Sequence, residues 1–331
     1  MIHFKRYKEN PIVTPGLYDW RMASTFNPGV IYDNGRFYLF ERAAGSLNPF
    51  RCSVGLLASD DGVTFRHLSD QPVFTGDHIA LPHASIQDPR VVKIDDTYYM
   101  NYAVRPYSYS CIPTGVTLPE YFTPAYDGKT VNPADNVTRS AIAVSKNLVH
   151  WKHLCYTTPP GIDDRDNVLF PEKINGKYAL LRRPMTAEGA PSMWISYSED
   201  LQQWTTPVCI ASPKYHWESA KIGASAPPLK TDAGWLVIYH GVDEKNAYRA
   251  GALLLDSQNP EKILARSKEP IIEPETYYEK TGLVIPNVVF PTGNVIVNDQ
   301  LYLYYGCCDT CISLATIAVD ELLNALSAEI L

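Results

Sequence analysis

The residues of this chain that could do chemistry are an aspartate and several cations near the ends of predicted strands. Asp88 comes directly ahead of a β-like run, and Arg165 precedes the apolar segment NVLF. Arg183 closes the stretch that follows the Asn175-Gly176 turn. Two arginines that point inward from strand ends would bind an anion, because the guanidinium fork matches the oxygens of phosphate or carboxylate. The alternative for each arginine is a surface ion pair with one of the surplus acids.

Three more polar residues lie within or beside apolar stretches. Lys221 and His240 each interrupt an otherwise apolar run, where a buried polar group must find a partner. Asp309 lies at the end of another candidate inner strand. Aspartates in such places are often turn or cap residues, and a lone lysine or histidine is often a satisfied structural residue. Taken singly, none of these residues identifies a site.

Five predicted hairpins would position these side chains. In each, an extended apolar run breaks at a short polar turn and resumes, and the turn residues tolerate positive φ. The five segments are residues 31–40, 91–102, 172–181, 229–239 and 295–305. Another β-like stretch follows each hairpin, beginning at Ser53, Ala141, Met193, Tyr248 and Cys311. The repeat unit is therefore about four strands, and five units fill the chain.

A period of roughly 40 to 65 residues with four strands per unit predicts an all-β fold, a five-bladed β-propeller. A sandwich would not explain the period. Helical spacing occurs only in a short C-terminal segment, residues 319–326. A propeller counts as one domain, so we expect residues 1–331 to form a single unit without a linker. Propellers bind ligands on the central axis, and function should therefore be sought near the inner-strand ends.

Composition restricts the partners and the location. The net charge of −7 argues against nucleic acid or an anionic membrane surface as a partner. The N-terminus lacks an apolar segment of signal-peptide length, and no run approaches the roughly 20 apolar residues of a membrane-spanning helix. The seven cysteines are odd in number and scattered, which favours reduced thiols over a disulfide framework. These features predict a soluble cytoplasmic protein.

One cysteine cluster raises the question of a metal site. Cys307, Cys308 and Cys311 lie close together in the sequence. No second Cys or His pair follows at zinc spacing, so we interpret the three residues as structural thiols and expect no metal.

Several segments together resemble glycoside hydrolase family 130, the β-mannoside phosphorylases and related β-mannosidases. The resemblance covers most of the chain. It rests on Phe26-Asn27-Pro28-Gly29, Gln87-Asp88-Pro89-Arg90-Val91, residues 165–173 with Arg183-Pro184, and residues 221–224, 239–242, 251–256, 286–291 and 306–310.

The resemblance implies a role for each candidate residue. It makes Asp88 the sole protein acid. The implied phosphate ligands are Arg165, Arg183, Lys221 and His240. The implied substrate-binding residues are Asn27, Arg42 and Asp309 of a mannosyl subsite, together with Arg90 and Tyr239 from the matching motifs. For a phosphorylase of this family, the resemblance implies inorganic phosphate as a co-substrate and no cofactor.

The chemistry of phosphorolysis fits that set of residues. An inverting glycosidase needs one carboxylic acid for the leaving oxygen and a second carboxylate to activate water. Phosphate is already an anionic nucleophile, so a phosphorylase needs cations and hydrogen-bond donors that aim it at the anomeric carbon. We therefore expect a β-mannoside and phosphate to give α-mannose 1-phosphate with inversion, Asp88 relaying its proton through a sugar hydroxyl as the resemblance implies.

Other functions stay open at this stage. A hydrolytic β-mannosidase on the same fold would need a second acid, for which Glu172, Glu218 and Asp243 lie near the right motifs. A non-catalytic glycan-binding propeller has no reason to combine Asp88 with a cationic cluster. The acceptor is also open among glucose, N-acetylglucosamine, mannose and β-1,2- or β-1,4-linked mannan chains, as is assembly into a homo-oligomer.

Two features depart from the usual family pattern. Gln87 occupies a position where an acid is common. Residues 105–138, rich in Pro, Tyr and Thr, form an insertion too long for an ordinary hairpin loop. Its aromatic side chains could stack on sugar rings, contact a neighbouring subunit or pack among themselves. They are Tyr107, Tyr109, Tyr121, Phe122 and Tyr126.

Overall fold

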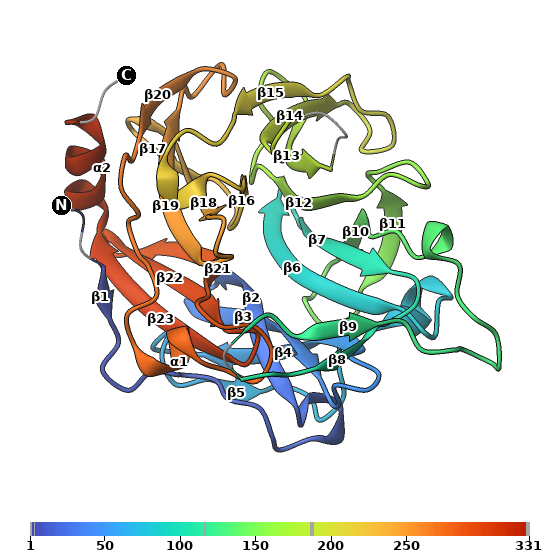
Figure 1. Cartoon of the computed structure of the whole chain (residues 1–331). Helices are drawn as coiled ribbons and strands as arrows, with labels where there is room; N and C mark the ends of the chain where they lie inside the picture. Colours follow the sequence, from blue (N-terminus) through green and yellow to red (C-terminus); the bar gives the residue numbers. More distant parts are fainter. Residues whose placement is uncertain (1, 3, 116, 186–188, 329–331) are drawn as a thin grey trace.

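Five antiparallel sheets stand around a central axis, each forming one blade (Figure 1). The computed structural model describes residues 2, 4–115, 117–185 and 189–328. The first strands of blades 1, 2, 3 and 4 contact one another in turn, and the first strand of blade 5 contacts the first strand of blade 1 and the second and third strands of blade 4. This arrangement confirms the predicted five-bladed β-propeller.

The strands of each blade, from the axis outward, have the following bounds. Blade 1 holds β2 (Ser24–Asp33), β3 (Arg36–Ala44), β4 (Cys52–Ser59) and β5 (Arg66–His67). Blade 2 holds β6 (Ser85–Ile94), β7 (Thr97–Arg105), β10 (Arg139–Ser145) and β11 (Lys152–Tyr156). Blade 3 holds β12 (Asp164–Leu169), β13 (Tyr178–Pro184), β14 (Met193–Ser198) and β15 (Val208–Ala211). Blade 4 holds β16 (Lys221–Ala224), β18 (Gly234–Val242), β19 (Tyr248–Leu255) and β20 (Ile263–Arg266). Blade 5 holds β21 (Val289–Val297), β22 (Gln300–Cys307), β23 (Cys311–Ala318) and β1 (Lys5–Arg6).

The predicted hairpin turns form because their residues adopt left-handed backbone conformations. Asn34, Asp95, Asn175 and Asn298 have φ of 50°, 53°, 51° and 51°. Asn and Asp populate this region more readily than other residues with a Cβ. Each turn joins the first strand of a blade to the second. The pairing of these two strands therefore follows from the local sequence in four blades.

Blade 4 differs from the prediction in its inner strand. The segment ahead of the turn at residues 231–234 forms only a short strand, β17 (Leu229–Thr231), which pairs with β18. The strand at the axis is instead β16, which pairs with the other end of β18. Pro227 and Pro228 separate β16 from β17, and proline lacks the N–H that a continuous strand would need.

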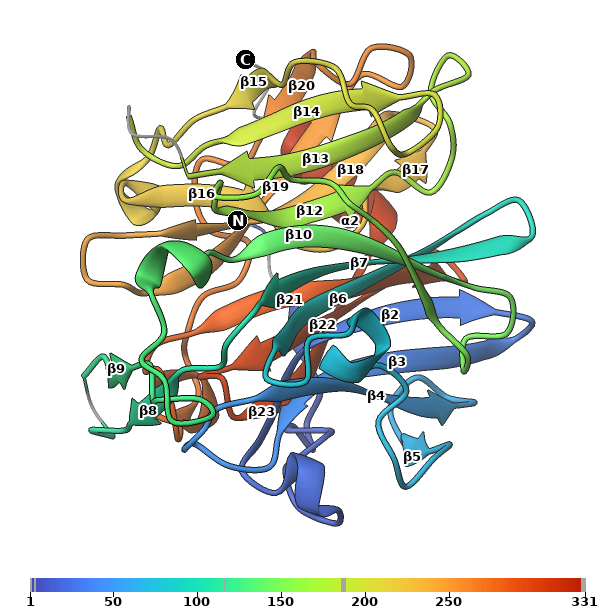
Figure 2. The same ribbon diagram turned by 90° about the vertical axis from the view of Figure 1, so that its right-hand side faces the viewer.

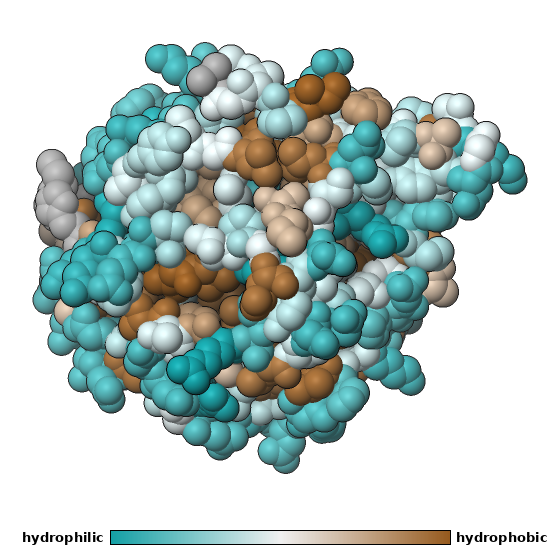
Figure 3. Space-filling model, turned by 90° about the horizontal axis from the view of Figure 1, so that it is seen from below, coloured by the Kyte–Doolittle hydropathy of each residue, from teal (hydrophilic) through white to brown (hydrophobic). Residues whose placement is uncertain are grey.

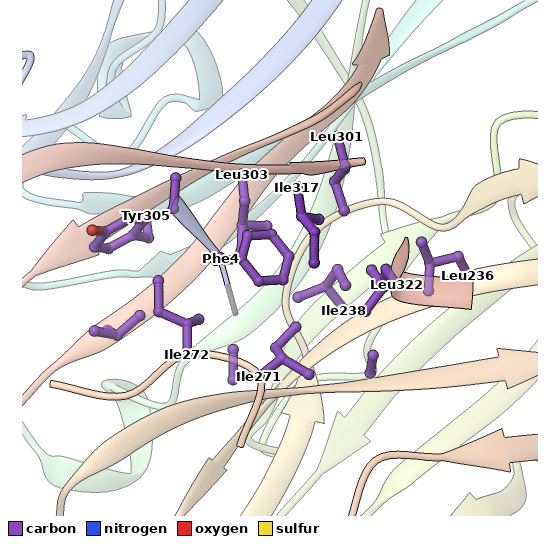
Figure 4. Close-up of a cluster of buried hydrophobic side chains, with 14 of the residues drawn as sticks. Phe4, Leu236, Ile238, Ile271, Ile272, Leu301, Leu303, Tyr305, Ile317 and Leu322 are labelled. Carbon is purple, nitrogen blue, oxygen red and sulfur yellow. The ribbon is translucent and has the colours of Figure 1, made fainter. Parts of the chain in front are cut away.

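The N-terminal strand closes the ring. β1 pairs with β23, placing Lys5 opposite Thr316 and Arg6 opposite Ala315. The outer strand of the last blade therefore comes from the other end of the chain, which the repeat pattern did not reveal. The side chain of Phe4 lies among apolar residues of blades 4 and 5 (Figure 4).

Short helices complete the fold. The predicted C-terminal helix is α2 (Val319–Ser327), and it contacts β19, β20 and β23 on the outside of blades 4 and 5. A single unpredicted turn, α1 (Tyr277–Lys280), precedes β21 and begins with a capping box between Thr276 and Glu279. The 3-10 helices are η1 (Asp19–Arg21), η2 (Gly76–Ile79), η3 (Pro133–Asp135) and η4 (His216–Glu218). No helix in the described part of the chain is long and apolar enough to cross a membrane.

The insertion projects from one end of the propeller. It carries its own two-stranded sheet, β8 (Ser110–Ile112) and β9 (Glu120–Phe122), which the side view shows at one face of the blades (Figure 2). The outer wall, seen from below, mixes hydrophilic residues with apolar ones that gather near its middle (Figure 3).

Removing the Phe4 side chain should weaken the closure of the ring. Phe4 is 7% exposed, and Phe→Ala substitutions at buried sites cost about 3–5 kcal/mol. We expect Phe4→Ala to lower the free energy of unfolding by that order, measured by urea denaturation. Tyr277→Ala is the control because Tyr277 is 82% exposed, and it should change stability by no more than about 0.5 kcal/mol. Equal losses in the two variants would contradict the closing role of Phe4.

Candidate active site

Three blades carry the same local irregularity near the axis. The pairing register shifts after Phe26 in β2, after Gln87 in β6 and after Arg165 in β12. The next residue in each strand is left-handed, with φ of 44° at Asn27, 50° at Asp88 and 55° at Asp166. A bulge of this kind re-aims a side chain away from the regular alternation of a strand. All three side chains line one pocket.

The pocket brings together most of the residues that the sequence nominated. Ten of them were predicted to act on phosphate or substrate, and eight line it. They are Asn27, Arg42, Asp88, Arg165, Arg183, Lys221, His240 and Asp309. They come from all five blades, so the polar wall exists only when the ring is closed.

Asp88 is held by two donors from blade 1. Its Oδ1 accepts a hydrogen bond from Asn27 Nδ2 at 2.9 Å and another from Arg42 Nη1 at 2.8 Å. Burial opposes ionisation of this carboxyl, but the charges of Arg42 and Arg90 and the two hydrogen bonds lower its pKa below the ordinary value. Asp88 is therefore a carboxylate in the empty pocket at neutral pH.

Asp309 has the opposite environment. It follows β22 in a tight turn, with φ of 50°. Burial raises its pKa to about 6, Arg42 lowers the pKa, and the neighbouring charge of Asp88 raises it. The charge of Arg42 thus acts on both carboxylates, and the opposite pKa shifts mean that Asp309 takes up a proton before Asp88 as pH falls.

The cationic side of the pocket is organised by a carboxylate that the sequence analysis did not single out. Asp166 Oδ2 lies 2.7 Å from Arg183 Nε and 3.7 Å from His240 Nε2, and its Oδ1 lies 3.0 Å from Arg90 Nη2. Nε and Nη1 of Arg183 and Oδ2 of Asp166 are buried and have no hydrogen-bond partner among the described residues, so Arg183 and Asp166 form an ion pair without a hydrogen bond. Leaving a buried charged donor unpaired is costly, and such a donor is suited to an anionic ligand.

His240 contributes a hydrogen-bonding group to this wall. Burial lowers its pKa to about 3; Asp166 raises the pKa, and Arg183, Lys221 and Arg90 lower it. The imidazole is therefore neutral at pH 7. Its Nδ1 lies 3.1 Å from Ser225 Oγ.

Lys221 and Arg165 complete the cationic wall. Lys221 Nζ donates a hydrogen bond to the Tyr248 hydroxyl at 2.9 Å. Arg165 forms a two-point ion pair with Asp163, from Nε at 2.8 Å and from Nη2 at 2.7 Å. Both side chains also line the pocket and add positive charge to it.

Arg90 and Tyr239 do not line the pocket, although the sequence analysis placed them in the substrate-binding set. Tyr239 precedes His240 on β18, and strand alternation directs neighbouring side chains to opposite faces. The Tyr239 hydroxyl donates to Glu218 Oε2 at 2.8 Å inside the blade. Arg90 is 1% exposed and lies behind Asp88, donating to the backbone oxygen of Ser225 at 2.6 Å. In this structure both residues support the wall from behind.

Comparison with known proteins shows the family to which this chain belongs. Residues 4–328 match the family model of glycoside hydrolase family 130, described as β-1,4-mannooligosaccharide phosphorylase. The chain belongs to glycoside hydrolase family 130. This is the mannoside phosphorylase family, as the resemblance implied, and the chain is an enzyme of that family.

Three relatives illustrate the similarity. A 1,2-β-oligomannan phosphorylase of Thermoanaerobacter sp. (strain X514) is 39% identical over 97% of this chain and 99% of its own length. A β-1,2-mannobiose phosphorylase of the same strain is 40% identical over 97% of this chain and 99% of its own length. The structure of β-1,2-mannobiose phosphorylase from Listeria innocua, in complex with β-1,2-mannobiose, superposes with a TM-score of 0.79. It is 26% identical to this chain, and the match covers 98% of this chain and 99% of the other.

The insertion of this family 130 member contributes two aromatic side chains to the pocket. Tyr109 and Tyr121 line it, and their rings meet edge to face at 4.8 Å between centroids. Tyr107 and Tyr126 instead pack against His83, outside the insertion, and against each other at 5.5 Å between ring centroids, so part of the insertion packs on itself. The pocket is also lined by residues to which the sequence analysis gave no role in a site. They are Gln87, Asp166, Tyr248, Ile285, Val288 and Phe290.

The acids named for a hydrolytic mechanism lie elsewhere. Glu172 pairs with Lys230, Glu218 pairs with Arg266 at 2.5 Å, and Asp243 pairs with Arg249 at 2.8 Å. None of the three acids lines the pocket. Each of these acids is therefore held in an ion pair away from the pocket.

The cysteine cluster is part of the packing. Cys307, Cys308 and Cys311 are buried free thiols, and Cys308 Sγ donates to the backbone oxygen of Glu279 at 3.0 Å. Within the described ranges, no group of three or more His, Cys, Asp or Glu residues is arranged to hold a metal ion.

The two carboxylates at Arg42 should affect stability in opposite directions with pH. The folded pKa of Asp309, about 6, lies above its ordinary value of 3.8, so its contribution is present below pH 3.8 and is lost as pH rises through 6. The folded pKa of Asp88 is lowered, so its contribution is present above the ordinary value and is lost as pH falls through the folded pKa.

Thermal melts of two variants measure this difference. We expect the melting temperature of Asp309→Asn minus that of wild type to rise between pH 4 and pH 7 and then to level off. This pH range follows from the pKa of about 6 for Asp309 in the folded enzyme. Asp88→Asn, the matched control, should lose stability relative to wild type as pH rises from strongly acidic values. The same pH trend in both variants would contradict the assignment of the proton to Asp309.

Proposed function

We propose that this enzyme cleaves a β-1,2-linked mannoside with inorganic phosphate, giving α-mannose 1-phosphate and a shortened acceptor. The observation that carries the proposal is one pocket lined by Asp88 together with all four candidate phosphate ligands. The buried, unpartnered Nη1 of Arg183 supports phosphate at that wall. Asn27, Arg42 and Asp309, on the side of Asp88, would hold the mannosyl group.

Three similar proteins support the proposed preference for the β-1,2 linkage. The two Thermoanaerobacter enzymes and the Listeria innocua enzyme are described as phosphorylases of β-1,2-mannosides. The family model is described by the β-1,4 linkage, so both linkages belong in the test.

The charges in the pocket suggest how the reaction is coupled to phosphate binding. Asp88 begins as a carboxylate, whereas the leaving oxygen must receive a proton. A phosphate anion bound in the same pocket would raise the pKa of Asp88, because like charges disfavour ionisation, and the carboxylate would then take up a proton from solvent. Phosphate attacks the anomeric carbon, the glycosidic C–O bond breaks, and the proton of Asp88 reaches the leaving oxygen through a mannosyl hydroxyl. In the synthetic direction the carboxylate takes the proton back.

Hydrolysis is the competing function. It would require one of the remaining pocket carboxylates, Asp166 or Asp309, to activate water. Asp166 is occupied by ion pairs with Arg183 and Arg90, and Asp309 lies beside Asp88 rather than on the cationic side. These contacts favour phosphorolysis over hydrolysis.

The cytoplasmic location is also part of the proposal. All seven cysteines are free thiols in the structure, which suits a reducing compartment.

Product analysis with and without phosphate tests the proposed reaction. We expect mannose 1-phosphate from β-1,2-mannobiose only when phosphate is present, with β-1,4-mannobiose and mannosyl-glucose as comparison substrates. Asp88→Asn should reduce kcat by about 10²- to 10⁴-fold, the usual contribution of general acid catalysis. Arg183→Ala should abolish saturation by phosphate. Free mannose at the same rate with or without phosphate would establish hydrolysis instead.

Tyr121 should contribute to binding of the acceptor sugar. It is 42% exposed and lines the pocket, whereas Phe122, its neighbour on β9, is equally exposed and does not. An aromatic contact of this kind is worth about 1 kcal/mol, or roughly five-fold in affinity. We expect Tyr121→Ala to lower kcat/KM for the mannoside about five-fold without changing KM for phosphate. Phe122→Ala should leave both parameters near wild type, and equal effects would remove Tyr121 from the acceptor subsite.

A further inference from the structure

Asp166 is a buried carboxylate to which the function described so far gives no role. It lies at the bulge of β12 with φ of 55° and is 4% exposed. It lines the pocket on the side of the candidate phosphate ligands. A carboxylate would ordinarily oppose an anion, so its place in this wall needs an explanation.

The contacts of Asp166 supply that explanation. Its two oxygens engage Arg183 and Arg90 at 2.7 Å and 3.0 Å, and His240 lies 3.7 Å away. Burial opposes ionisation of Asp166, but the charge of Arg183, that of His240 when it is protonated, and the charges of Arg90 and Lys221 lower the pKa of Asp166 well below the ordinary value. Asp166 is thus ionised whenever the enzyme is folded at neutral pH.

The backbone around Asp166 is built to permit these contacts. A Cβ on Gly223 would lie 2.8 Å from Asp166 Oδ2 and 2.7 Å from His240 Cε1. Contacts below 3.0 Å would force these groups apart, so only glycine at position 223 leaves room for both.

Like charges at this wall would separate without a counter-ion. Arg90, Arg183 and Lys221 all act on Asp166, and mutual repulsion between such cations is strong at a buried site. The ion pair at 2.7 Å holds the guanidinium of Arg183 beside Asp166, while Nε and Nη1 of Arg183 have no hydrogen-bond partner among the described residues. The carboxylate therefore balances the charge of Arg183 and leaves its N–H donors available to a ligand.

We propose that Asp166 is the positioning residue of the phosphate subsite: it accepts a hydrogen bond from Arg90 and holds Arg183 in the geometry that receives an oxyanion. This inference rests on the proposed function, because it names what organises the phosphate ligands of that reaction. Its effect on phosphate binding is nevertheless measurable without turnover.

Asp164 offers a matched control two residues earlier on the same strand. It is fully buried and also pairs with an arginine, since Arg182 Nε donates to Asp164 Oδ2 at 2.9 Å. Asp164 and Arg182 do not line the pocket. Any general effect of neutralising a buried, arginine-paired aspartate in β12 should therefore appear in Asp164→Asn as well.

The experiment compares Asp166→Asn with Asp164→Asn in the full-length enzyme. Asparagine keeps the size of the side chain and tolerates positive φ, so the bulge at residue 166 is preserved. Losing hydrogen bonds between charged groups should raise KM for phosphate in Asp166→Asn by roughly 10- to 100-fold, with KM for the mannoside within about two-fold of wild type. Asp164→Asn should lower the melting temperature while leaving both KM values near wild type.

Calorimetric titration with inorganic phosphate separates this inference from the proposed reaction. Weaker phosphate binding by Asp166→Asn alone supports the positioning role even if wild type forms no mannose 1-phosphate, in which case only the proposed reaction fails. Unchanged or tighter phosphate binding by Asp166→Asn would overturn the inference, since the carboxylate would then merely repel the anion. Equal weakening in the two variants would also overturn it, because the role would be structural.

Discussion

The guanidinium of Arg90 connects three blades at the axis, and the site depends on it. Arg90 extends from β6 and binds the backbone oxygen of Ser225, just after β16, and the carboxylate of Asp166 in β12. It also donates to the backbone oxygen of Asp88 at 3.1 Å. Each N–H donor of a buried guanidinium needs a hydrogen-bond acceptor. Here the acceptors lie on or next to the strands that carry the candidate acid and the candidate phosphate ligands. The contacts that hold blades 2, 3 and 4 together at the axis therefore also position the site.

Around this centre, buried charges compensate one another in two groups. Arg42 is shared by Asp88 and Asp309, whose pKa values move in opposite directions. Asp166 is shared by arginines and by His240, which burial keeps neutral. The first group suits proton transfer, which needs carboxyls of unequal pKa. The second suits an oxyanion, which needs oriented donors. The proposed reaction would use both functions in one pocket.

Much of the fold could be predicted because its signals are local. The turn residues Asn34, Asp95, Asn175 and Asn298 determine their own backbone conformations and hence the hairpins. The closure could not be predicted from the repeat, since the pairing of β1 with β23 joins the two ends of the chain. The split between β16 and β17 had a local signal in Pro227-Pro228, but the more regular hairpin that follows obscured it.

For the site, the sequence by itself determined which residue types were available and which strands carried them. Asp88, Arg165 and Arg183 were recognisable from motifs, and Asn27, Asp88 and Asp166 share a bulge that the Asx residues themselves favour. Tertiary structure alone decided that His240 faces the pocket while Tyr239 faces the blade, and that Asp166 lies among the cations. The reason is that the surroundings of a side chain, and hence its pKa, depend on residues from other blades. Electrostatic interactions between residues far apart in the chain have no local sequence pattern.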